Sequence, residues 1–509
     1  MLYYTLLIVS HYFNRLLIDN KQITAMFENC YTMKYSHYFK DIRFWIILFF
    51  IVRLYGIFFP PLEVSHNWRQ TTVTMVARNF SEEGANLLYP KIDIAGEKSG
   101  ITGMEFPVLN YLIYLVSFLF GYEHWYGRLI NLIVSSFGIW YFYRLIKKYF
   151  KEDIAFNASI VLLFSIWYTY SRKIMPDTFS MSLMIAGLYY ALNYLDEGKT
   201  KDLIPAFLLV IIGTLAKLPS AYLLTLLALP YLSRNFQLNR KLWLGSLLGI
   251  GLIFPLWFYF KWVPYLETTF GFHHFFMGKS MATGTKELIQ HWPETLSKFY
   301  DIAIKYIAFA FLLWGLFKAI RTKETLLLRI FFIGFIGFLP IMLKGGFTFY
   351  HHSYYIIPFV PVMALMSAYG ISLLPSVRWT TIVLVAIGLE GFFNHLDDFR
   401  IKPVNKAVLQ LEPIMDVISQ PKDLVAINSG AFPTPMYFAH RKGWVAFNDQ
   451  LSKSHYIDSL SQLGLRHIII MKRTFGDSMR VNSYKHQWFL RYRDINFDIY
   501  SIDTSGLNK

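Results

Sequence analysis

Residues 58–72 place four chemically capable side chains in one short segment. The stretch reads FFPPLEVSHNWRQTT, so Glu63, His66, Trp68 and Arg69 directly follow an apolar run that ends in a proline pair. A carboxylate or an imidazole can act as a general base, and a guanidinium can bind an anionic phosphate. The alternative is a set of charges that only marks a membrane interface, and the segment by itself leaves both interpretations open.

Further acidic and basic residues follow in two other motifs. Glu105 lies in GMEFPVLNYL, and Asp177 lies in SRKIMPDTFS close behind Arg172 and Lys173. Asp177 could cap the start of a helix by accepting amide hydrogen bonds. It could equally be a positioned acid beside cations that bind a phosphate. Glu105 belongs to the same loop as Glu63 and His66, and two carboxylates with a histidine in one loop strengthen the functional interpretation of Glu63.

Two more motifs place polar groups within or beside apolar runs. Lys217 lies in IIGTLAKLPSAYLL, where the cost of a buried lysine makes a functional or cavity-facing role the default and snorkelling the alternative. The run GGFTFYHHSYYIIP supplies His351, His352, Tyr354 and Tyr355. An interfacial aromatic belt explains the tyrosines but explains the paired histidines less well. These residues are therefore candidates for substrate binding.

The composition is that of a membrane protein. Of 509 residues, 55% are hydrophobic, 19% aromatic and only 16% charged. The formal net charge of +16 comes from short basic clusters between apolar runs, which is typical of topology signals and argues against binding to nucleic acid. A single cysteine, Cys30, excludes a disulfide framework and a thiolate metal site. The start of the chain, MLYYTLLIVSHYF, lacks the features of a signal peptide.

The apolar runs predict about eleven transmembrane helices, because each is long enough to cross a bilayer or nearly so. The predicted spans are 44–60, 128–146, 154–171, 178–195, 203–216, 218–232, 242–260, 301–318, 326–343, 354–374 and 378–394.

The run 106–120 is also apolar, but as a helix it would cover only about 22 Å against the roughly 30 Å of a bilayer core. If it does not cross, the later basic clusters fall on the same side as the basic residues that precede the first span, as the positive-inside rule requires. We therefore expect 61–127 to be one external loop with surface helices at 66–80 and 106–120. All the candidate motifs then lie on the external face.

Three regions follow from this topology. Residues 1–43 form a cytoplasmic extension, residues 44–394 form the transmembrane region, and residues 395–509 become polar and mixed in character. The last region contains strand-like DLVAIN and HIIIM with helical IDSLSQLGL between them, so it predicts a small external α/β domain.

The order of these motifs resembles that of the C-type-fold polytopic glycosyltransferases. Within that group the chain is most similar to the dolichyl-phosphate-mannose protein mannosyltransferases and the bacterial lipid A aminoarabinose transferases, known as glycosyltransferase family 39. The resemblance covers roughly residues 44–375. Two positions depart from the family pattern: LEVSHNWRQ stands where an aspartate is usual after the first span, and FPVL after Glu105 lacks the usual basic residue.

The resemblance implies a fold, an activity and roles for the candidate residues. It implies transfer of one sugar from a polyprenyl monophosphate carrier, of the undecaprenyl type, to an acceptor outside the cell inner membrane, with inversion. The acceptor would be a lipid-linked glycan, lipid A or a protein. No cofactor is certain, and a divalent cation between Glu63 and Glu105 stays open. The implied catalytic residues are Glu63 as the base, with His66 as its rival, together with Glu105 and Asp177.

The implied donor-binding residues are the cations and rings of the remaining motifs. Arg69, Arg172, Lys217 and His351 would stabilise the leaving phosphate. Trp68, His352, Tyr354 and Tyr355 would offer faces for the sugar or the prenyl chain. The full set of implied donor-binding residues is Arg69, Trp68, Arg172, Lys217, His351, His352, Tyr354 and Tyr355.

Other classes of protein stay open at this point. A lipid or solute transporter would also have many spans with intramembrane charges, although the chain shows no matching halves. A scaffold would leave Glu63 and Asp177 replaceable. A polymerase or ligase of surface polysaccharide would share the compartment and the lipid chemistry.

Overall fold

The computed structural model describes residues 39–273, 278–475 and 488–502. Cys30, most of the predicted N-terminal extension 1–43 and part of the run HHFFMGK lie outside the described residues.

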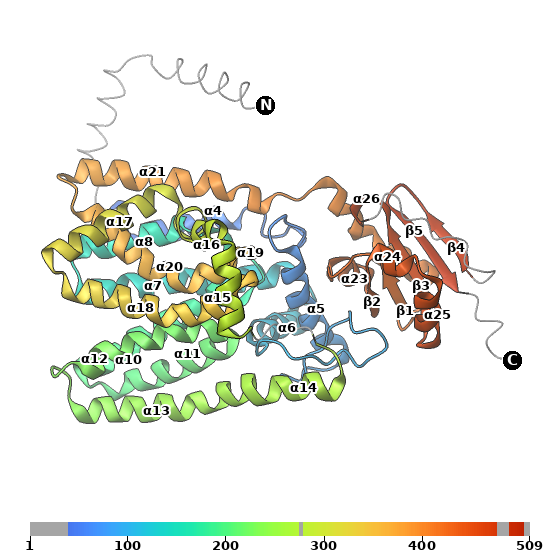
Figure 1. Cartoon of the computed structure of the whole chain (residues 1–509), viewed down its shortest axis with the longest axis horizontal. Coiled ribbons are helices and arrows are strands. Elements are labelled where there is room, and N and C mark those ends of the chain that lie inside the picture. The colour runs from blue at the N-terminus through green and yellow to red at the C-terminus, as the bar shows by residue number, and fades with distance from the viewer. Residues whose placement is uncertain (1–38, 274–277, 476–487, 503–509) are drawn as a thin grey trace, which may run out of the picture.

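A bundle of helices forms the larger part of the molecule (Figure 1). Each predicted span has a helix at its position, because long apolar runs satisfy their backbone hydrogen bonds internally. The helices of the bundle are α4 (Ile42–Leu54), α7 (Trp125–Tyr149), α8 (Glu152–Phe164), α9 (Trp167–Tyr170), α10 (Pro176–Glu197), η1 (Thr200–Asp202), α11 (Leu203–Ala216), η2 (Leu218–Leu227), α12 (Ala228–Leu232), α13 (Leu238–Trp257), η3 (Phe258–Trp262), α14 (Val263–Phe270), α15 (Met281–Gln290), α16 (Trp292–Ser297), η4 (Lys298–Ala303), α17 (Lys305–Thr322), α18 (Thr325–Gly345), α19 (Phe347–His351), η5 (Ser353–Phe359), α20 (Val360–Ser372) and α21 (Val377–His395).

Several of these helices are long and apolar enough to cross a membrane. Five qualify among the described residues, or six if the pair 292–303 and 305–322, bent by 100°, counts as one span. This confirms a polytopic helical membrane protein, whereas the number eleven is not confirmed. Only 17% of the window in α18 is buried, against 89% in the span of η5 and α20. Helix α18 therefore faces outward, and α20 runs through the interior of the bundle.

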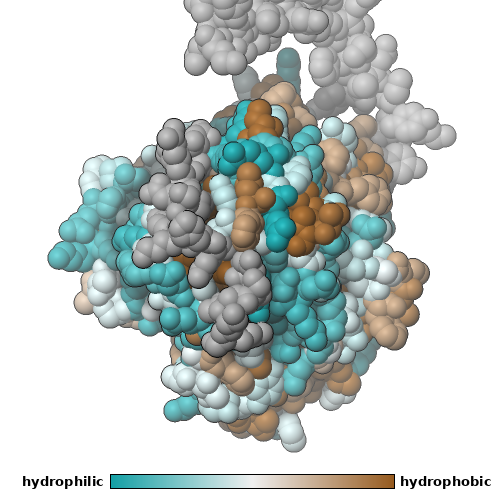
Figure 2. Space-filling model, turned by 90° about the vertical axis from the view of Figure 1, so that its right-hand side faces the viewer, coloured by the Kyte–Doolittle hydropathy of each residue, from teal (hydrophilic) through white to brown (hydrophobic). Residues whose placement is uncertain are grey.

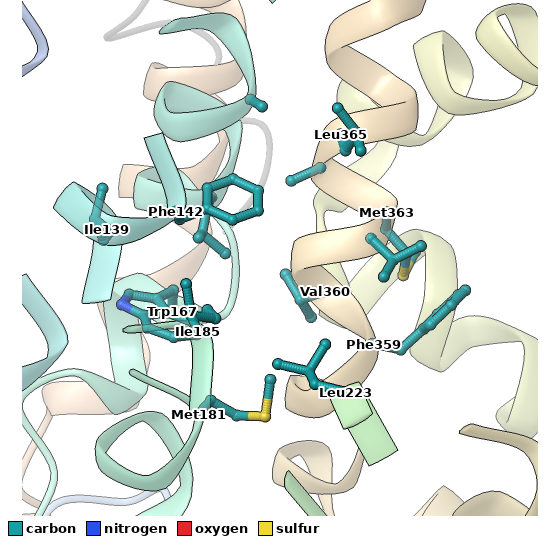
Figure 3. Packing of buried hydrophobic residues seen from close by; sticks show 14 of the residues in the cluster. Ile139, Phe142, Trp167, Met181, Ile185, Leu223, Phe359, Val360, Met363 and Leu365 are labelled. Atoms are coloured by element: carbon teal, nitrogen blue, oxygen red, sulfur yellow. The ribbon is translucent and has the colours of Figure 1, made fainter. Parts of the chain in front are cut away.

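The core of the bundle forms where α20 meets its neighbours. Figure 3 shows Phe359, Val360 and Met363 facing Trp167 and Met181 across the interior. Helices α17 and α20 cross closely because small residues line the crossing. A Cβ on Gly370 would lie 2.1 Å from the carbonyl oxygen of Phe311, so this position admits only glycine without a shift of the backbone.

Basic residues gather at one end of the bundle. Lys148, near the end of α7, forms an ion pair of 2.6 Å with Asp196 near the end of α10. Arg240, in the first turns of α13, donates to the carbonyl oxygens of Leu195 and Asp196. The opposite ends of α7 and α10 carry Arg128 and Asp177. The basic residues Lys148 and Arg240 therefore lie at one end of these helices, and the candidate site lies at the other end.

The loop 61–127 contains two helices, as expected, but they have different surroundings. Helix α6 (Val108–Phe120) has 13 residues and an apolar exposed end, where Phe118 and Phe120 are each 74% exposed. Helix α5 (Asn67–Glu83) is buried over most of its length and packs against α6 and against the C-terminal region. Protein therefore covers α5 along most of its length, and its orientation along the membrane surface stays a prediction.

A small α/β domain follows the bundle, as predicted. Its sheet has the order β2-β1-β3-β5-β4, in which β1, β2 and β3 are parallel while β4 and β5 form an antiparallel pair at one edge. DLVAIN became β1 and HIIIM lies in β3. Figure 2 views the molecule from this end and shows a mainly hydrophilic face. The elements are η6 (Asp397–Phe399), η7 (Pro403–Gln410), α22 (Leu411–Ile418), β1 (Leu424–Ile427), α23 (Thr434–Ala439), β2 (Gly443–Val445), α24 (Asn448–Leu451), α25 (Ser454–Gln462), β3 (Leu465–Met471), α26 (Lys472–Phe475), β4 (Trp488–Arg493) and β5 (Phe497–Ile502).

The α/β domain shares a hydrophobic cluster with the loop 61–127. Met75 and Phe80 of α5 belong to the same cluster as Met436 and Ile469. Arg78 strengthens the contact, since it donates to the carbonyl oxygen of Tyr437 at 2.9 Å. The loop and the domain therefore form one packed unit at one end of the bundle (Figure 1).

His440 joins this unit through two carboxylates. Its Nε2 lies 2.8 Å from Glu82 of α5, and its Nδ1 bonds Glu412 of α22. The hydrogen bonds with Glu412 and then Glu82 raise the pKa of His440 to about 9. The raised pKa means that this contribution to stability is fully present below about 6.5, the ordinary pKa of histidine, and is lost as pH rises through about 9.

We expect His440→Asn to reduce the pH dependence of stability at this contact. Asn tolerates the left-handed backbone of His440, which has φ 49°, but does not titrate. The thermal unfolding midpoint of the native chain should fall more between pH 6.5 and pH 10 than that of the variant. The effect is small and shrinks with salt, because all three side chains are partly exposed. Equal falls in both chains would contradict the assignment.

Candidate active site

Five separate segments bring the predicted residues to one end of the bundle. They are the start of α5, the loop before α6, the turn between α9 and α10, the turn between α11 and η2, and the turn between α19 and η5. Each lies where one helix ends or the next begins, so the regular hydrogen bonding of the backbone is interrupted there. Side chains from these breaks can point into the same space.

Glu63 occupies a buried position among cations. Its carboxylate is 3.2 Å from the Arg128 guanidinium, 3.1 Å from Arg172 and 3.2 Å from the Lys173 ammonium. Gln70 donates a further hydrogen bond at 3.0 Å. Glu63 itself is 0% exposed. Three cations therefore share one carboxylate that solvent does not reach.

These neighbours control the charge of Glu63. Burial by itself raises the pKa of this carboxyl, but Arg128, Lys173 and Arg172 outweigh burial and lower the pKa to about 2. Its oxygens already accept hydrogen bonds from protein donors, so they are not available to an acceptor hydroxyl. Glu63 therefore fits the role of an ionic centre that holds the loop to the bundle.

His66 lies at the start of α5 in a left-handed conformation with φ 61°. Its Nδ1 is 2.9 Å from the hydroxyl of Tyr170, which in turn is 2.6 Å from the hydroxyl of Ser353. Burial, followed by the charge of Lys173, lowers the pKa of His66 to about 3. The imidazole is therefore neutral at neutral pH and retains a free electron pair on one ring nitrogen.

A second charged group, called the Lys217 group below, consists of Lys217, Asp177, Glu105 and Arg69. The Lys217 ammonium is 2.6 Å from Asp177 and 3.8 Å from Glu105. Arg69 forms an ion pair with the same Glu105. Asp177 thus pairs with a lysine from the next helix break, and among the described residues no amide hydrogen bond supports capping as its role.

The two carboxylates of this group each keep one unused oxygen. Oε2 of Glu105 and Oδ2 of Asp177 are buried and have no hydrogen-bond partner among the described residues. Such acceptors can receive hydrogen bonds from sugar hydroxyls.

A divalent cation between Glu63 and Glu105 does not fit this arrangement. The oxygens of Glu63 accept from arginine, lysine and glutamine, and Lys217 provides the positive charge beside Glu105. In the described parts of the chain no three His, Cys, Asp or Glu side chains gather.

Aromatic rings connect His66 with the Lys217 group. The ring of Tyr354 lies 5.0 Å from His66 and 4.8 Å from the Lys217 ammonium. His352 stacks on Tyr354 at 5.4 Å and lies 5.6 Å from Trp68. These rings form one wall between the neutral histidine and the charged group.

Two predicted donor-binding residues flank this wall. Tyr355 stacks on Tyr354 at 4.9 Å, so it extends the aromatic surface. His351 is exposed and stacks on Phe347 at 4.9 Å. No ion pair to His351 occurs among the residues that the structure describes. The ring contacts of His351 are therefore with Phe347 and, at 5.0 Å, with His352 of the aromatic wall.

Arg172 also differs from the expected arrangement. Its contacts are Glu63, the carbonyl oxygen of Tyr55 and the ring of Phe399 at 4.4 Å, whereas Arg69 and Lys217 pair with Glu105 and Asp177. The predicted cations therefore divide into two groups.

The structure adds residues that the motifs did not reveal. Arg128 and Gln70 complete the surroundings of Glu63, while Tyr170 and Ser353 orient His66. Arg128 gave a signal, since it is a cation at the start of an apolar span. Tyr170 is one of many tyrosines in apolar runs, so no feature of the sequence singled it out.

Comparison with known proteins supplies the family context. Residues 105–259 match the family model of dolichyl-phosphate-mannose-protein mannosyltransferases. That segment contains Glu105, Arg172, Asp177 and Lys217. The structure of ArnT from Cupriavidus metallidurans in the apo state superposes with a TM-score of 0.56 at 12% identity, covering 90% of this chain and 97% of ArnT. The chain has the C-type glycosyltransferase fold. With the family match, this identifies it as a membrane glycosyltransferase.

Other solved structures share the C-type fold at low sequence identity. ArnT bound to undecaprenyl phosphate has a TM-score of 0.55 at 11% identity, covering 91% of this chain and 98% of ArnT. The apo oligosaccharyltransferase of Archaeoglobus fulgidus has a TM-score of 0.55 at 8% identity, covering 93% of this chain and 75% of that enzyme. The arabinofuranosyltransferase AftD from Mycobacteria has a TM-score of 0.51 at 13% identity, with 90% of this chain and 41% of AftD covered. A search of curated proteins by sequence found no match.

Proposed function

We propose that this glycosyltransferase transfers one sugar from a polyprenyl monophosphate donor to a cell-envelope acceptor, with inversion at the anomeric carbon. The observation that carries the proposal is the match of residues 105–259 to a family named for a polyprenyl-phosphate sugar donor, over a segment that supplies the Lys217 group. The ArnT structure with bound undecaprenyl phosphate supports a lipid monophosphate as the donor carrier.

His66 is the residue that best fits the base. A base must be unprotonated and must reach the acceptor hydroxyl, and His66 is neutral and only partly buried, whereas Glu63 is fully enclosed by cations. If Nδ1 donates its hydrogen to Tyr170, Nε2 accepts the proton of the acceptor hydroxyl. A bound phosphate would raise the pKa of His66, since an anion favours the imidazolium.

The displacement then proceeds in one step. The acceptor oxygen forms a bond to the anomeric carbon while the bond from that carbon to the phosphate oxygen breaks. Polyprenyl phosphate leaves with the electron pair, and His66 holds the proton. Lys217 and Arg69 stabilise the charge that develops on the leaving phosphate. The unused oxygens of Glu105 and Asp177 accept hydrogen bonds from sugar hydroxyls.

The proposed topology places this site outside the inner membrane. The basic ends of α7, α10 and α13 face the cytoplasm, and the site lies at the opposite ends. In that arrangement, about eleven spans cross the membrane between residues 44 and 394. Residues 1–43 are then cytoplasmic, and the loop 61–127 and the domain 395–509 are external.

The experiment that tests the function measures release of polyprenyl phosphate. The purified full chain in lipid nanodiscs receives labelled polyprenyl-phosphate hexoses or pentoses together with a cell-envelope extract as the acceptor source. We expect acceptor-dependent release with the native chain. Lys217→Met should lower kcat/KM about 10- to 100-fold, the loss expected for one hydrogen bond to a charged group.

Lys199→Met is the matched control. Lys199 pairs with Glu197 at the far end of α10, a helix of 22 residues, so roughly 30 Å separate it from Asp177. Its replacement should leave turnover unchanged. If the native chain releases no polyprenyl phosphate from any of these donors, the proposed function is wrong.

A further inference from the structure

A cavity lies where the end of α4 meets the end of α21, outside the Lys217 group. It has a volume of about 740 Å³ and combines an apolar wall with several cations. Val52 and Tyr55 contribute from the α4 side, and Phe392 and Leu396 contribute from the α21 side. The proposed reaction uses none of these four residues.

Arg53 faces this cavity from inside an apolar helix. It is 2% exposed, and its guanidinium lies between the rings of Tyr168 and Phe399, 4.3 Å from each. Its hydrogen bond to the carbonyl oxygen of Thr169 is long, at 3.4 Å, and its Nε has no partner among the described residues. No carboxylate of the described residues pairs with Arg53. A buried cation without an anion is costly, so its position calls for an anionic ligand.

Further cations line the same cavity. Arg172 contributes a guanidinium whose Nε also lacks a partner among the described residues. Arg400 and Lys406 stand on the linker that closes the cavity toward the α/β domain. The carboxylates described near these cations are Glu63, on Arg172, Asp397, on Arg400 at 2.7 Å, and Asp398, which accepts a hydrogen bond from Thr169 at 2.8 Å. Positive charge therefore exceeds negative charge around the cavity.

We propose that this cavity binds the phosphate of an anionic lipid, with Arg53 and Arg172 on the phosphate and the apolar wall along the lipid chain. The combination of a desolvated guanidinium pair with aromatic and aliphatic walls fits an amphiphile better than a free inorganic anion. Two lipids carry this chemistry: a polyprenyl monophosphate and a phosphate-bearing membrane lipid. The binding does not depend on turnover, so it can be tested separately from the proposed function.

The site would be coupled to the proposed reaction through Glu63. Arg172 contacts this cavity and also binds Glu63, which lies in the same loop as His66. A phosphate that binds Arg172 would compete with Glu63 for its hydrogen bonds. Binding of a phosphate in the cavity can therefore alter the position of the loop that carries His66.

The test measures lipid binding to the full chain in neutral detergent micelles by native mass spectrometry. The probes are farnesyl monophosphate, dioctanoyl phosphatidic acid and, as the uncharged counterpart, farnesol. We expect both phosphates to bind more tightly than farnesol. Arg53→Gln should weaken phosphate binding at least about tenfold, since it removes a hydrogen bond to a charged group.

Two further variants keep the result interpretable. Leu396→Trp narrows the apolar wall at a residue that is 47% exposed, so it should weaken binding without disturbing a buried charge. Arg43→Gln makes the same chemical change as Arg53→Gln at the other end of α4, on a side chain 70% exposed, and should leave binding unchanged. Native-like binding by both Arg53→Gln and Leu396→Trp would overturn the proposal. So would equal binding of farnesol and farnesyl monophosphate.

The affinity that each phosphate loses on Arg53→Gln assigns the lipid, because farnesyl monophosphate can also bind at the proposed donor site. A greater loss for farnesyl monophosphate identifies the cavity as a site for a polyprenyl carrier. A greater loss for phosphatidic acid identifies it as a site for a membrane lipid or a lipid acceptor.

Discussion

Replacing His66 with asparagine is expected to lower kcat about 10²- to 10⁴-fold, the range for loss of a general base. Asparagine tolerates the left-handed backbone at this position and can still bond the Tyr170 hydroxyl, but it has no atom that replaces Nε2. The measurement is release of polyprenyl phosphate at saturating donor, with thermal unfolding as a check on the fold.

His352→Asn is the matched control for this loss. His352 stacks on Tyr354 in the same site, and burial followed by His351 lowers its pKa to about 4. If the His352 variant loses kcat as strongly while the His66 variant retains it, the base has been assigned to the wrong histidine. Because the pKa of His66 is about 3, protonation of the free enzyme at this residue should not limit kcat/KM between pH 5 and pH 8.

Replacing Glu63 with glutamine is expected to destabilise the protein by about 3–5 kcal/mol, the cost of breaking a buried ion pair by removing one partner. The amide would leave Arg128, Arg172 and Lys173 close together without an anion. The measurement is the free energy of unfolding in detergent, compared with transfer activity per folded molecule.

Glu83→Gln provides the contrast. Glu83 pairs with Lys91 and Lys442 at a partly exposed site, so its replacement should cost no more than about 1 kcal/mol. A Glu63→Gln protein with native stability and no transfer activity would show that Glu63 is the base after all. A loss of stability with activity retained per folded molecule would support its role as an ionic centre.

Sequence patterns located the charged motifs but did not assign partners to them. Lys217 stood out because lysine is costly in an apolar run, and the structure pairs it with Asp177. The same reasoning could have singled out Arg53, an arginine within the first apolar span. The role of Glu63 was less accessible, because Arg128 and Lys173 come from segments that lie far from it in the sequence.

The local pattern of the chain determined its class, the positions of its helices and the character of its last region. Apolar length fixes where a chain can cross a bilayer, and the alternation in DLVAIN and HIIIM fixes strands, since both depend on neighbours in sequence. The tertiary structure decided that α5 is covered by the C-terminal domain rather than by lipid. It also decided that Glu63 is the carboxylate enclosed by cations and that His66 is neutral. Charge state depends on burial and on the few ångströms between side chains from separate helix breaks, and sequence spacing does not contain those distances.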